Sequence, residues 1–361
     1  MRVLVTGGLG LVGRSVVADL LAQGHVVRLF DTPGAGPVHR ILAAAGTARR
    51  RLRSLLAART PEGIPRLEVV RGDLCNIAHV GEAAREVDAA IHLGAMIPPA
   101  ADRYPRRAAY VNEGGTANLV RALERRSPDA RLVFASSIAV YGDRRRDPLI
   151  RPGDPVNPGA HDAYAQAKVA AERIVAASSL RWVILRLSYV VSPEKLAMDP
   201  LMFSMPLDTR LEVCSVADTA RAFVNAIDAD DVEGRILTIA GGEACRTTYR
   251  DYLDTMTTLF GLGPGFLPAA AFSTADFHCA YVDTADSQRL LDYQRQTLAD
   301  YYLAVSRRVR LRRLLIRGFP LLRRVVRSRL ARRSPFLPPG RAPGANAVLA
   351  TLFRRLRRHH A

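Results

Sequence analysis

The stretch Thr6-Gly7-Gly8-Leu9-Gly10-Leu11-Val12-Gly13 decides the fold of this 361-residue chain. It follows an apolar run typical of a strand and opens a segment with helical periodicity. Gly7 permits a tight turn, Gly10 lets the backbone approach a pyrophosphate, and Gly13 allows the helix to pack closely on the sheet. The helix N-terminus then presents free N–H groups and the positive end of its dipole. The pattern predicts a dinucleotide site, with a purely structural glycine-rich turn as the alternative.

Outward from this turn, short β-branched runs alternate with longer helical patterns, which is typical of βαβ units on a parallel sheet. The predicted strands are Arg2–Thr6, Val26–Phe30, Leu67–Arg71, Ala89–Leu93, Arg131–Ala135, Trp182–Leu187 and Arg235–Ala240. The predicted helices span residues 11–23, 76–86, 106–126, 162–178 and 216–228, with a basic helix over residues 49–59. We therefore expect an α/β domain over residues 1–190, completed by about residues 213–240. Residues 191–212 and 241–305 are expected to form a smaller substrate lobe.

Asp31 ends the second predicted strand, and its carboxylate is placed to choose the cofactor. A carboxylate there accepts hydrogen bonds from both ribose hydroxyls and repels a 2′-phosphate, which favours NAD over NADP. Arg28 on the same strand and Arg40 beyond it keep NADP as an alternative.

The segment Tyr164-Ala-Gln-Ala-Lys168 places a phenol and an ammonium four residues apart, on one face of a predicted helix. A tyrosine, with an ordinary pKa of about 10, is a poor base near neutral pH unless a cation stabilises its phenolate. Lys168 can supply that charge and can also hold the nicotinamide ribose. Ser137, just after the fifth predicted strand, is placed to hydrogen-bond the reacting oxygen. Surface packing is the alternative for such a pair taken alone, but its position downstream of a dinucleotide turn favours catalysis.

These elements together resemble the extended short-chain dehydrogenase/reductase family, in its NAD-dependent epimerase/dehydratase group, over about residues 1–305. The matching segments are Thr6–Gly13, Gly72-Asp73-Leu74, His92-Leu93-Gly94-Ala95, Asn112 with Gly115-Thr116, Ser136-Ser137 with Val140-Tyr141-Gly142, Tyr164 with Lys168, Arg186-Leu187, Val216-Ala217-Asp218 and Gly234 with Gly241-Gly242. The resemblance implies a doubly wound parallel sheet, a small-molecule substrate and a homodimer.

The resemblance also assigns site residues. It makes Tyr164 the general acid/base, Lys168 its activator and Ser137 the partner of the substrate oxygen, while Asn112 helps to shape the site. Asp73 and Leu74 would meet the adenine, and the loop from His92 would meet the phosphate and nicotinamide side. The expected cofactor-binding set is Gly7, Gly10, Leu11, Val12, Gly13, Asp31, Asp73, Leu74, His92, Leu93, Gly94, Ala95, Ala135, Tyr164 and Lys168.

The sequence departs from nucleotide-sugar epimerases chiefly where the substrate would bind. Ser188-Tyr189 stands where those enzymes often carry an asparagine, and residues 191–209 lack basic groups for a diphosphate apart from Lys195. Tyr189 and Arg210 are candidate substrate contacts, with core and surface roles as their alternatives. A UDP-sugar is therefore less strongly indicated as the substrate than the resemblance to these enzymes suggests.

The net charge of +18 resides in the last part of the chain, because residues 306–361 hold 17 Arg and no Asp or Glu follows Asp300. Leucine and valine recur there at helical spacing, and Gly318-Phe319-Pro320 should divide the pattern into two helices, with a third piece over residues 349–358. A basic amphipathic tail is typical of binding to an anionic membrane surface. A solvated or docked tail is the alternative, and nucleic acid is disfavoured because no nucleic-acid recognition motif is present.

The remaining composition argues for a cytoplasmic enzyme. Four scattered cysteines without metal-ligand spacing indicate a reducing compartment and no metal, and no signal peptide or membrane span is expected. The sequence predicts an NAD-dependent oxidoreductase or epimerase that transfers hydride at a carbinol carbon of a sugar, a nucleotide sugar or a related alcohol or ketone. The alternative is a catalytically weak NAD-binding scaffold, which the tail brings to a membrane, such as the inner face of the cell membrane, or to a complex.

Overall fold

The computed structural model describes residues 1–35, 58–61 and 63–337. The predicted basic helix over residues 49–59 and the third tail segment over residues 349–358 lie wholly or mostly outside the described residues. The chain forms two compact units. The first comprises Met1–Val191, Glu212–Cys245 and His278–Gln296, and the second comprises Ser192–Leu211, Arg246–Phe277 and Thr297–Ala361.

The first unit is built on a seven-stranded sheet in the order β10-β7-β5-β4-β1-β2-β3, and every neighbouring pair is parallel. The strands are β1 (Arg2–Thr6), β2 (Val26–Asp31), β3 (Leu67–Arg71), β4 (Ala89–His92), β5 (Arg131–Ser137), β7 (Arg181–Leu187) and β10 (Arg235–Ile239). The strand order reverses between β1 and β4, and such a switch point is where doubly wound sheets bind dinucleotides. The doubly wound parallel sheet is confirmed.

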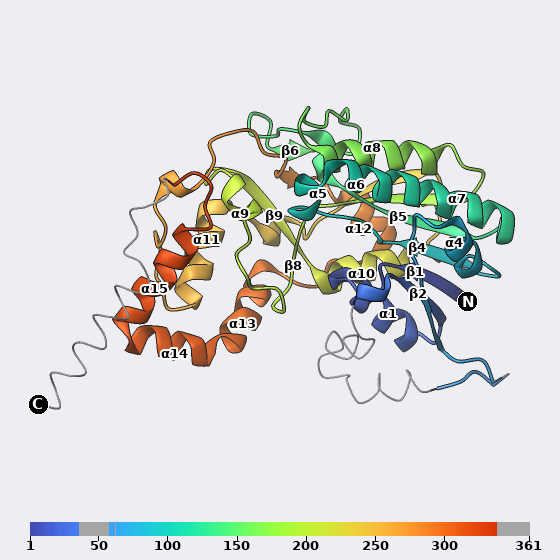
Figure 1. The fold of residues 1–361 in the computed structure, drawn as a ribbon, viewed down its shortest axis with the longest axis horizontal. Helices are drawn as coiled ribbons and strands as arrows, with labels where there is room; N and C mark the ends of the chain where they lie inside the picture. The colour runs from blue at the N-terminus through green and yellow to red at the C-terminus, as the bar shows by residue number, and fades with distance from the viewer. Residues whose placement is uncertain (36–57, 62, 338–361) are drawn as a thin grey trace, which may run out of the picture. The chain divides into compact units, whose positions relative to one another are not determined.

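Helices cover both faces of this sheet (Figure 1). On one face lie α1 (Leu11–Ala22) and α10 (Val216–Asn225), and on the other lie α4 (Ile77–Ala83), α7 (Gly115–Arg126) and α8 (Ala163–Ala176). Successive residues of a strand point to opposite faces, so Val3 and Val5 join the core beneath α1 while Leu4 joins the core beneath α4. Both faces of every central strand are thus buried, which explains their continuous apolar character.

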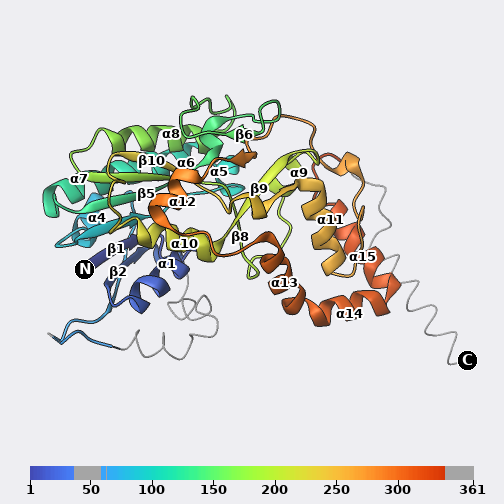
Figure 2. The same cartoon turned by 180° about the vertical axis from the view of Figure 1, so that it is seen from behind.

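Shorter elements complete the first unit. They are η1 (Pro33–Ala35), α5 (Ala100–Arg103), α6 (Pro105–Ala109), η4 (Tyr110–Gly114), η5 (Ile138–Tyr141), β6 (Leu149–Ile150), β8 (Tyr189–Val191), η6 (Glu243–Cys245), β12 (Tyr281–Val282) and α12 (Ala285–Leu291), together with most of β9 (Arg210–Ser215). Figure 2 shows α12 beside β10. Residues 278–296, which the sequence pattern groups with the lobe, pack on the sheet here. Tyr293 is fully buried, and its hydroxyl donates to the Ala240 carbonyl at 2.7 Å.

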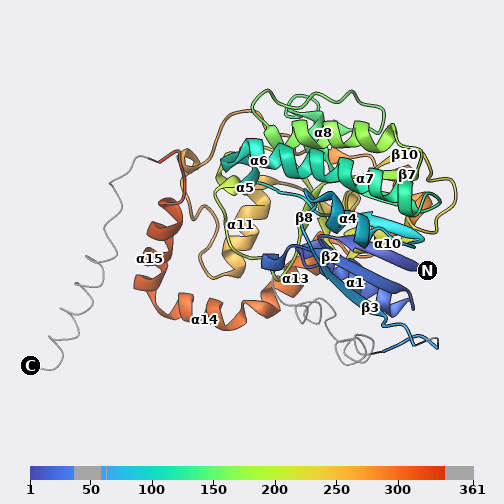
Figure 3. The same cartoon turned by 45° about the vertical axis from the view of Figure 1, so that its right-hand side comes forward.

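The second unit is mainly helical. Its elements are α9 (Leu201–Ser204), β11 (Arg246–Thr248), α11 (Tyr249–Leu259), η7 (Ala269–Ala271), α13 (Leu298–Arg308), α14 (Arg310–Gly318) and α15 (Pro320–Ala331). Figure 3 shows α13, α14 and α15 following one another around α11. The predicted break at Gly318-Phe319-Pro320 is confirmed, because α14 ends at Gly318 and α15 begins at Pro320. None of the described helices combines the length and the apolar character needed to cross a membrane.

Candidate active site

The glycine-rich turn between β1 and α1 has no room for side chains at two of its positions. Gly7 has φ +68°, and a Cβ there would lie 2.8 Å from the Gly94 nitrogen. A Cβ on Gly13 would lie 2.2 Å from the Gly7 carbonyl oxygen. Gly10 precedes α1 without a side-chain cap, and the first turn of α1 carries no acidic residue. The helix N-terminus is therefore open to an anion, as a phosphate cradle requires.

Asp31 is held at the edge of this turn. Its Oδ2 accepts a hydrogen bond from the Leu9 N–H at 2.9 Å, and its Oδ1 accepts one from the Thr32 N–H at 2.8 Å. The bond to Leu9 ties the carboxylate at the end of β2 to the glycine-rich segment. Asp31 thus combines a fixed position with remaining acceptor capacity for a diol.

Arg28, the residue that kept NADP open as an alternative, is committed elsewhere. It is nearly buried, its Nε donates to Glu68 Oε2 at 2.7 Å, and its Nη1 donates to the Ala83 carbonyl at 3.0 Å. This side chain is therefore not available to a 2′-phosphate at the end of β2. Arg40, the other basic candidate, lies outside the described residues.

His92 ends β4 and braces the two loops at the switch point. Thr116 Oγ1 donates to the Asn112 carbonyl at 2.6 Å, so it accepts from His92 Nε2 at 3.1 Å. The His92 Nδ1 then accepts from Thr6 Oγ1 at 2.6 Å, and Thr6 Oγ1 accepts from the Gly94 N–H at 3.1 Å. Burial, together with a smaller contribution from the positive charge of Lys168, lowers the pKa of His92 to about 3. Both ring nitrogens of His92 are therefore bonded inside the protein, which leaves its side chain no free hydrogen-bonding group for a cofactor.

The depressed pKa of His92 predicts a pH-dependent stability. Between about pH 6.5 and pH 3 the unfolded chain binds a proton that the folded chain does not, so the free energy of unfolding falls as the pH falls. The slope is about 1.4 kcal/mol per pH unit. His92→Gln removes this contribution. We expect the stability gap between wild type and His92→Gln to shrink by about 2 kcal/mol from about pH 7 to about pH 5, measured by urea unfolding.

The exposed His161 offers the control for this measurement, because His161→Gln replaces the same residue type without disturbing a buried network. A gap that stays constant between the two pH values would mean that His92 titrates alike in the folded and unfolded chain.

Asn112 holds the segment that follows β4. It lies in η4, a turn of wider π-type winding between α6 and α7, and it is buried. Its Oδ1 accepts from the Met96 N–H at 2.7 Å, and its Nδ2 donates to the Met96 carbonyl at 2.9 Å. The oxygen and the nitrogen of the Asn112 amide are thus both bonded to the backbone of Met96. Asn112 therefore acts on the site by fixing the loop around Met96.

The residues expected near the adenine follow β3. Asp73 is exposed, and its Oδ1 accepts from the Cys75 N–H at 2.9 Å. Leu74 is nearly buried and packs close to Gly94 and Gly115. Leu93 donates its N–H to the Thr6 carbonyl at 3.2 Å, so the segments after β1, β3 and β4 lie against one another.

Tyr164 and Ser137 meet between α8 and the end of β5. Ser137 Oγ accepts from the Ala139 N–H at 3.2 Å, which orients the hydroxyl at the start of η5. The pKa of Tyr164 is raised to about 12, chiefly by burial, with the neighbouring Ser137 hydroxyl lowering it and the charge of Asp162 raising it. Asp162 caps α8, accepting from the Ala165 N–H at 2.9 Å. The phenol therefore needs a cation before it can act as a base near neutral pH.

Lys168 is the nearest cation on α8. It is buried, its Nζ donates to the Ala135 carbonyl at 2.6 Å, and it lies 5.9 Å from the centre of the Tyr164 ring. Burial lowers the pKa of Lys168 to about 8, while the charge of Glu172 raises it. The ammonium therefore remains largely protonated near neutral pH. The carbonyl of Ala135 orients it at the end of β5.

Glu172, one helical turn beyond Lys168, forms a buried ion pair with Arg186, and neither residue is among the site residues predicted from the sequence. Glu172 Oε2 accepts from Arg186 Nη2 at 2.7 Å, and Glu172 Oε1 accepts from Arg186 Nε at 2.9 Å. Arg186 also donates to the Tyr141 hydroxyl at 2.8 Å, and Ser136 donates to Glu172 Oε1 at 2.5 Å. Glu172 stands one helical turn after Lys168, so the spacing Tyr164, Lys168, Glu172 along one helix face was the available signal.

The two proposed substrate contacts belong to different units. Tyr189 is half-buried in β8, and Arg210 is exposed at the start of β9. Lys195 is also exposed, in the second unit, and its Nζ lies 3.9 Å from Asp199 Oδ2. In residues 1–35, 58–61 and 63–337, no group of three or more His, Cys, Asp or Glu side chains is placed to hold a metal ion.

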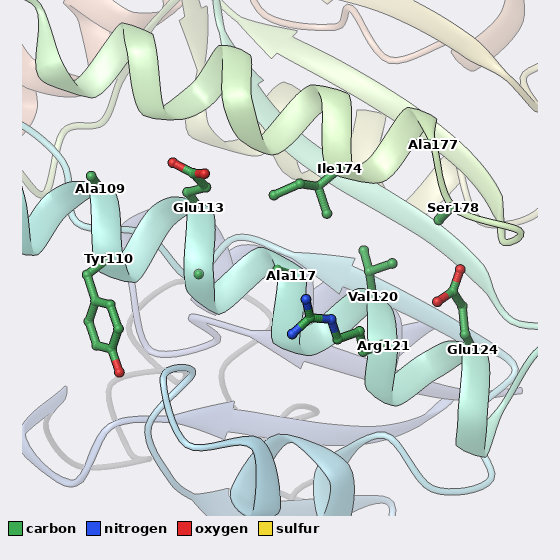
Figure 4. Close-up of a pocket in the computed structure, with 11 residues that line it drawn as sticks. Ala109, Tyr110, Glu113, Ala117, Val120, Arg121, Glu124, Ile174, Ala177 and Ser178 are labelled. Atoms are coloured by element: carbon green, nitrogen blue, oxygen red, sulfur yellow. The ribbon is translucent and has the colours of Figure 1, made fainter.

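A groove of about 590 Å³ lies apart from these residues, between η4, α7 and α8. Figure 4 shows Val120 and Ile174 facing each other across it, with Glu113 and Glu124 directed toward α8. Its lining contains none of Ser137, Tyr164 and Lys168. The groove is therefore distinct from the candidate catalytic residues.

Comparison with protein families gives one match over most of the chain. The model of the NAD dependent epimerase/dehydratase family matches residues 3–240. The 3β-hydroxysteroid dehydrogenase/Δ5→4-isomerase of Mycobacterium tuberculosis is 34% identical over 186 residues, which cover 49% of this chain and 43% of that enzyme. The UDP-glucose 4-epimerase of Neisseria gonorrhoeae is 27% identical over 198 residues, or 52% of each chain. The match thus spans about half the length of these curated relatives.

Solved structures share the fold. The dTDP-glucose 4,6-dehydratase DesIV of Streptomyces venezuelae, solved with NAD bound, aligns with a TM-score of 0.67 at 23% identity. The alignment covers 87% of this chain and 98% of that one.

Proposed function

Because the chain belongs to the NAD dependent epimerase/dehydratase family, we propose that it transfers hydride between NAD and a carbinol carbon of its substrate. The observation that carries the proposal is the clustering of three groups: Ser137 lies near enough to the Tyr164 phenol to lower its pKa, and the Lys168 ammonium lies 5.9 Å from the centre of the Tyr164 ring. A phenol, a hydroxyl and a buried cation at the ends of parallel strands form a unit suited to moving one proton.

The residues present fit NAD. The open N-terminus of α1, at Leu11, Val12 and Gly13, would hold the pyrophosphate, and Asp31 would accept from the adenosine ribose hydroxyls. Asp73 and Leu74 would lie by the adenine. When bound, NAD accepts or returns a hydride at its nicotinamide ring. The family's dependence on NAD agrees with the preference expected from Asp31.

Tyr164 would take the proton of the substrate hydroxyl as the hydride leaves the carbon that bears this hydroxyl. Ser137 would hold the substrate oxygen beside the phenol through its hydroxyl. Lys168, charged and held by the Ala135 carbonyl, would stabilise the phenolate that burial disfavours and would hold the nicotinamide ribose. In the reverse direction Tyr164 would return the proton to a carbonyl oxygen. Release of the ketone makes a dehydrogenase, and return of hydride to the other face makes an epimerase.

The substrate proposed is a secondary alcohol or its ketone, either a sugar, a nucleotide sugar or a related alcohol. Two curated relatives support this range, because one is named as a hydroxysteroid dehydrogenase and the other as a UDP-glucose epimerase. Residues 191–209 contain one basic residue, the exposed Lys195, and the exposed Arg210 follows them directly. They offer little charge for a diphosphate, so uncharged alcohols belong in any substrate panel.

The experiment incubates the purified full chain with NAD and a panel of 3β-hydroxysteroids, simple secondary alcohols, UDP-glucose and dTDP-glucose. We expect at least one compound to yield NADH or an epimerised product. We also expect NADH to bind more tightly than NADPH, because Asp31 would accept hydrogen bonds from the ribose hydroxyls and Arg28 is bound to Glu68. Tighter binding of NADPH would contradict the assignment of Asp31.

Tight NAD binding without turnover on any compound would favour the alternative, a scaffold that binds the dinucleotide and is recruited elsewhere. A scaffold has no chemical use for Ser137, Tyr164 and Lys168 in one cluster, and this argues for the enzyme. The homodimer that the family resemblance implies stays a prediction.

A further inference from the structure

The helix α14 presents its apolar side chains to solvent. Leu311, Leu314 and Leu315 are 75%, 59% and 54% exposed, whereas Ile316 alone is buried in this helix. At 100° per residue the three leucines fall within one third of the helix circumference, opposite Ile316. Among the described residues nothing covers this face. Most helices are stabilised by burying such a face, so α14 has an unused one.

The same exposed character continues into the next helix. Phe319 is 61% exposed at the joint, Leu322 is 40% exposed, and α15 contains no buried residue. We call the exposed apolar side chains of this helix pair, Leu311, Leu314, Leu315, Phe319 and Leu322, the leucine face.

Arginines flank the leucine face. Residues 306–337 hold 12 Arg and no Asp or Glu. Arg310 and Arg317 lie along one side of the leucines and Arg312 along the other, by the same helical arithmetic. In the part of the chain that the structure describes, no arginine of α14 or α15 forms an ion pair with a carboxylate.

We propose that the leucine face of α14 and α15 docks on an anionic lipid bilayer, with its leucines at the boundary between headgroups and acyl chains. A helix that combines an apolar stripe with flanking arginines lies in that boundary. Guanidinium groups pair bidentately with phosphates, so the headgroups supply the missing negative charge. The nine residues of α14 are far fewer than the roughly 20 needed to span a bilayer, so the helix lies on the membrane.

The charge pattern separates this occupant from others. A second copy of the chain on the same face would bring two arginine clusters together, and like charges across an interface disfavour association. Nucleic acid would use the arginines but gives the exposed leucines no apolar partner, since its outer surface is phosphate and sugar.

The test is sedimentation of the full chain with vesicles of equal parts phosphatidylcholine and phosphatidylglycerol at low salt. We expect wild type to sediment with these vesicles but not with pure phosphatidylcholine, and to be released as salt rises. The triple variant Leu311→Gln/Leu314→Gln/Leu315→Gln should lose most of the binding although its charge is unchanged. In the variant Arg310→Gln/Arg312→Gln/Arg317→Gln the affinity for the anionic vesicles should fall about fivefold per substituted residue, on the order of a hundredfold in all.

Ile77→Gln supplies the control, because Ile77 is a 48% exposed aliphatic residue of the other unit. It should bind vesicles as wild type does. Full-length protein that ignores the anionic vesicles at low salt would overturn the proposal. Equal vesicle binding by wild type and the leucine variant would also overturn it, and would indicate a purely electrostatic surface such as one for nucleic acid. Equal vesicle binding together with dissociation of a dimer in the leucine variant would indicate that a second copy of the chain covers the leucine face. Turnover of a water-soluble substrate without vesicles should be the same in all variants.

Discussion

Tyr164→Phe will lower turnover by about 10²–10⁴-fold, because it removes the proton carrier and leaves the rest of the site in place. The aromatic ring remains to pack beside Lys168, whose Nζ lies 5.9 Å from the centre of the ring. Binding of NAD should therefore stay near the wild-type value. Steady-state kinetics on whichever compound proves active, together with NADH binding by fluorescence, separate the two effects.

The matched control is Tyr110→Phe, which deletes the same hydroxyl at a position that is 63% exposed on η4. It should leave turnover unchanged. Unaltered turnover in Tyr164→Phe would remove this residue from the mechanism, even if NAD binding and hydride transfer were both demonstrated for wild type.

Arg186→Met will destabilise the protein by about 3–5 kcal/mol, because removing one partner of a buried ion pair leaves the other charge unpaired. Both side chains are almost fully buried, at 6% and 8% exposure for Arg186 and Glu172. The Tyr141 hydroxyl loses its donor in the same substitution. Urea unfolding of wild type and variant measures the difference.

The control comes from the other end of the same strand. Arg181 pairs with Glu233 at 2.9 Å, but both side chains are about half exposed, so Arg181→Met should cost at most about 1 kcal/mol. The double variant Arg186→Met/Glu172→Met should recover part of the stability, since an apolar pair carries no unpaired charge. Equal losses for Arg181→Met and Arg186→Met would contradict the expected role of burial.

Much of the sheet unit could be predicted because its signals are local. Strands buried on both faces need continuous apolar runs, and the turn after β1 needs glycine at Gly7 and Gly13, where a Cβ would collide with backbone. The wide turn at η4 was not predicted, and residues 106–126 read as one helix. Its extra winding coincides with Asn112, whose amide bonds the Met96 backbone, a contact that no helical periodicity encodes.

The environment of the candidate site was less accessible to sequence reasoning. The hydrogen bonds of the His92 ring depend on Thr6 and Thr116, which are distant along the chain, so the sequence does not predict them. The return of residues 278–296 to the sheet likewise depends on contacts such as that of Tyr293 with Ala240. Hydrogen bonds between remote segments leave no periodic trace in the sequence.

The contrast between the two lysines of the chain gives amine chemistry an unusual selectivity. Lys168 is 4% exposed with its Nζ bound to a carbonyl, whereas the side chain of Lys195 is 57% exposed. An acylating reagent therefore meets one accessible side-chain amine, and that amine belongs to the second unit. A fluorophore attached there, paired with one at the amino terminus of the first unit, would report how far apart the two units stand when dinucleotide is added.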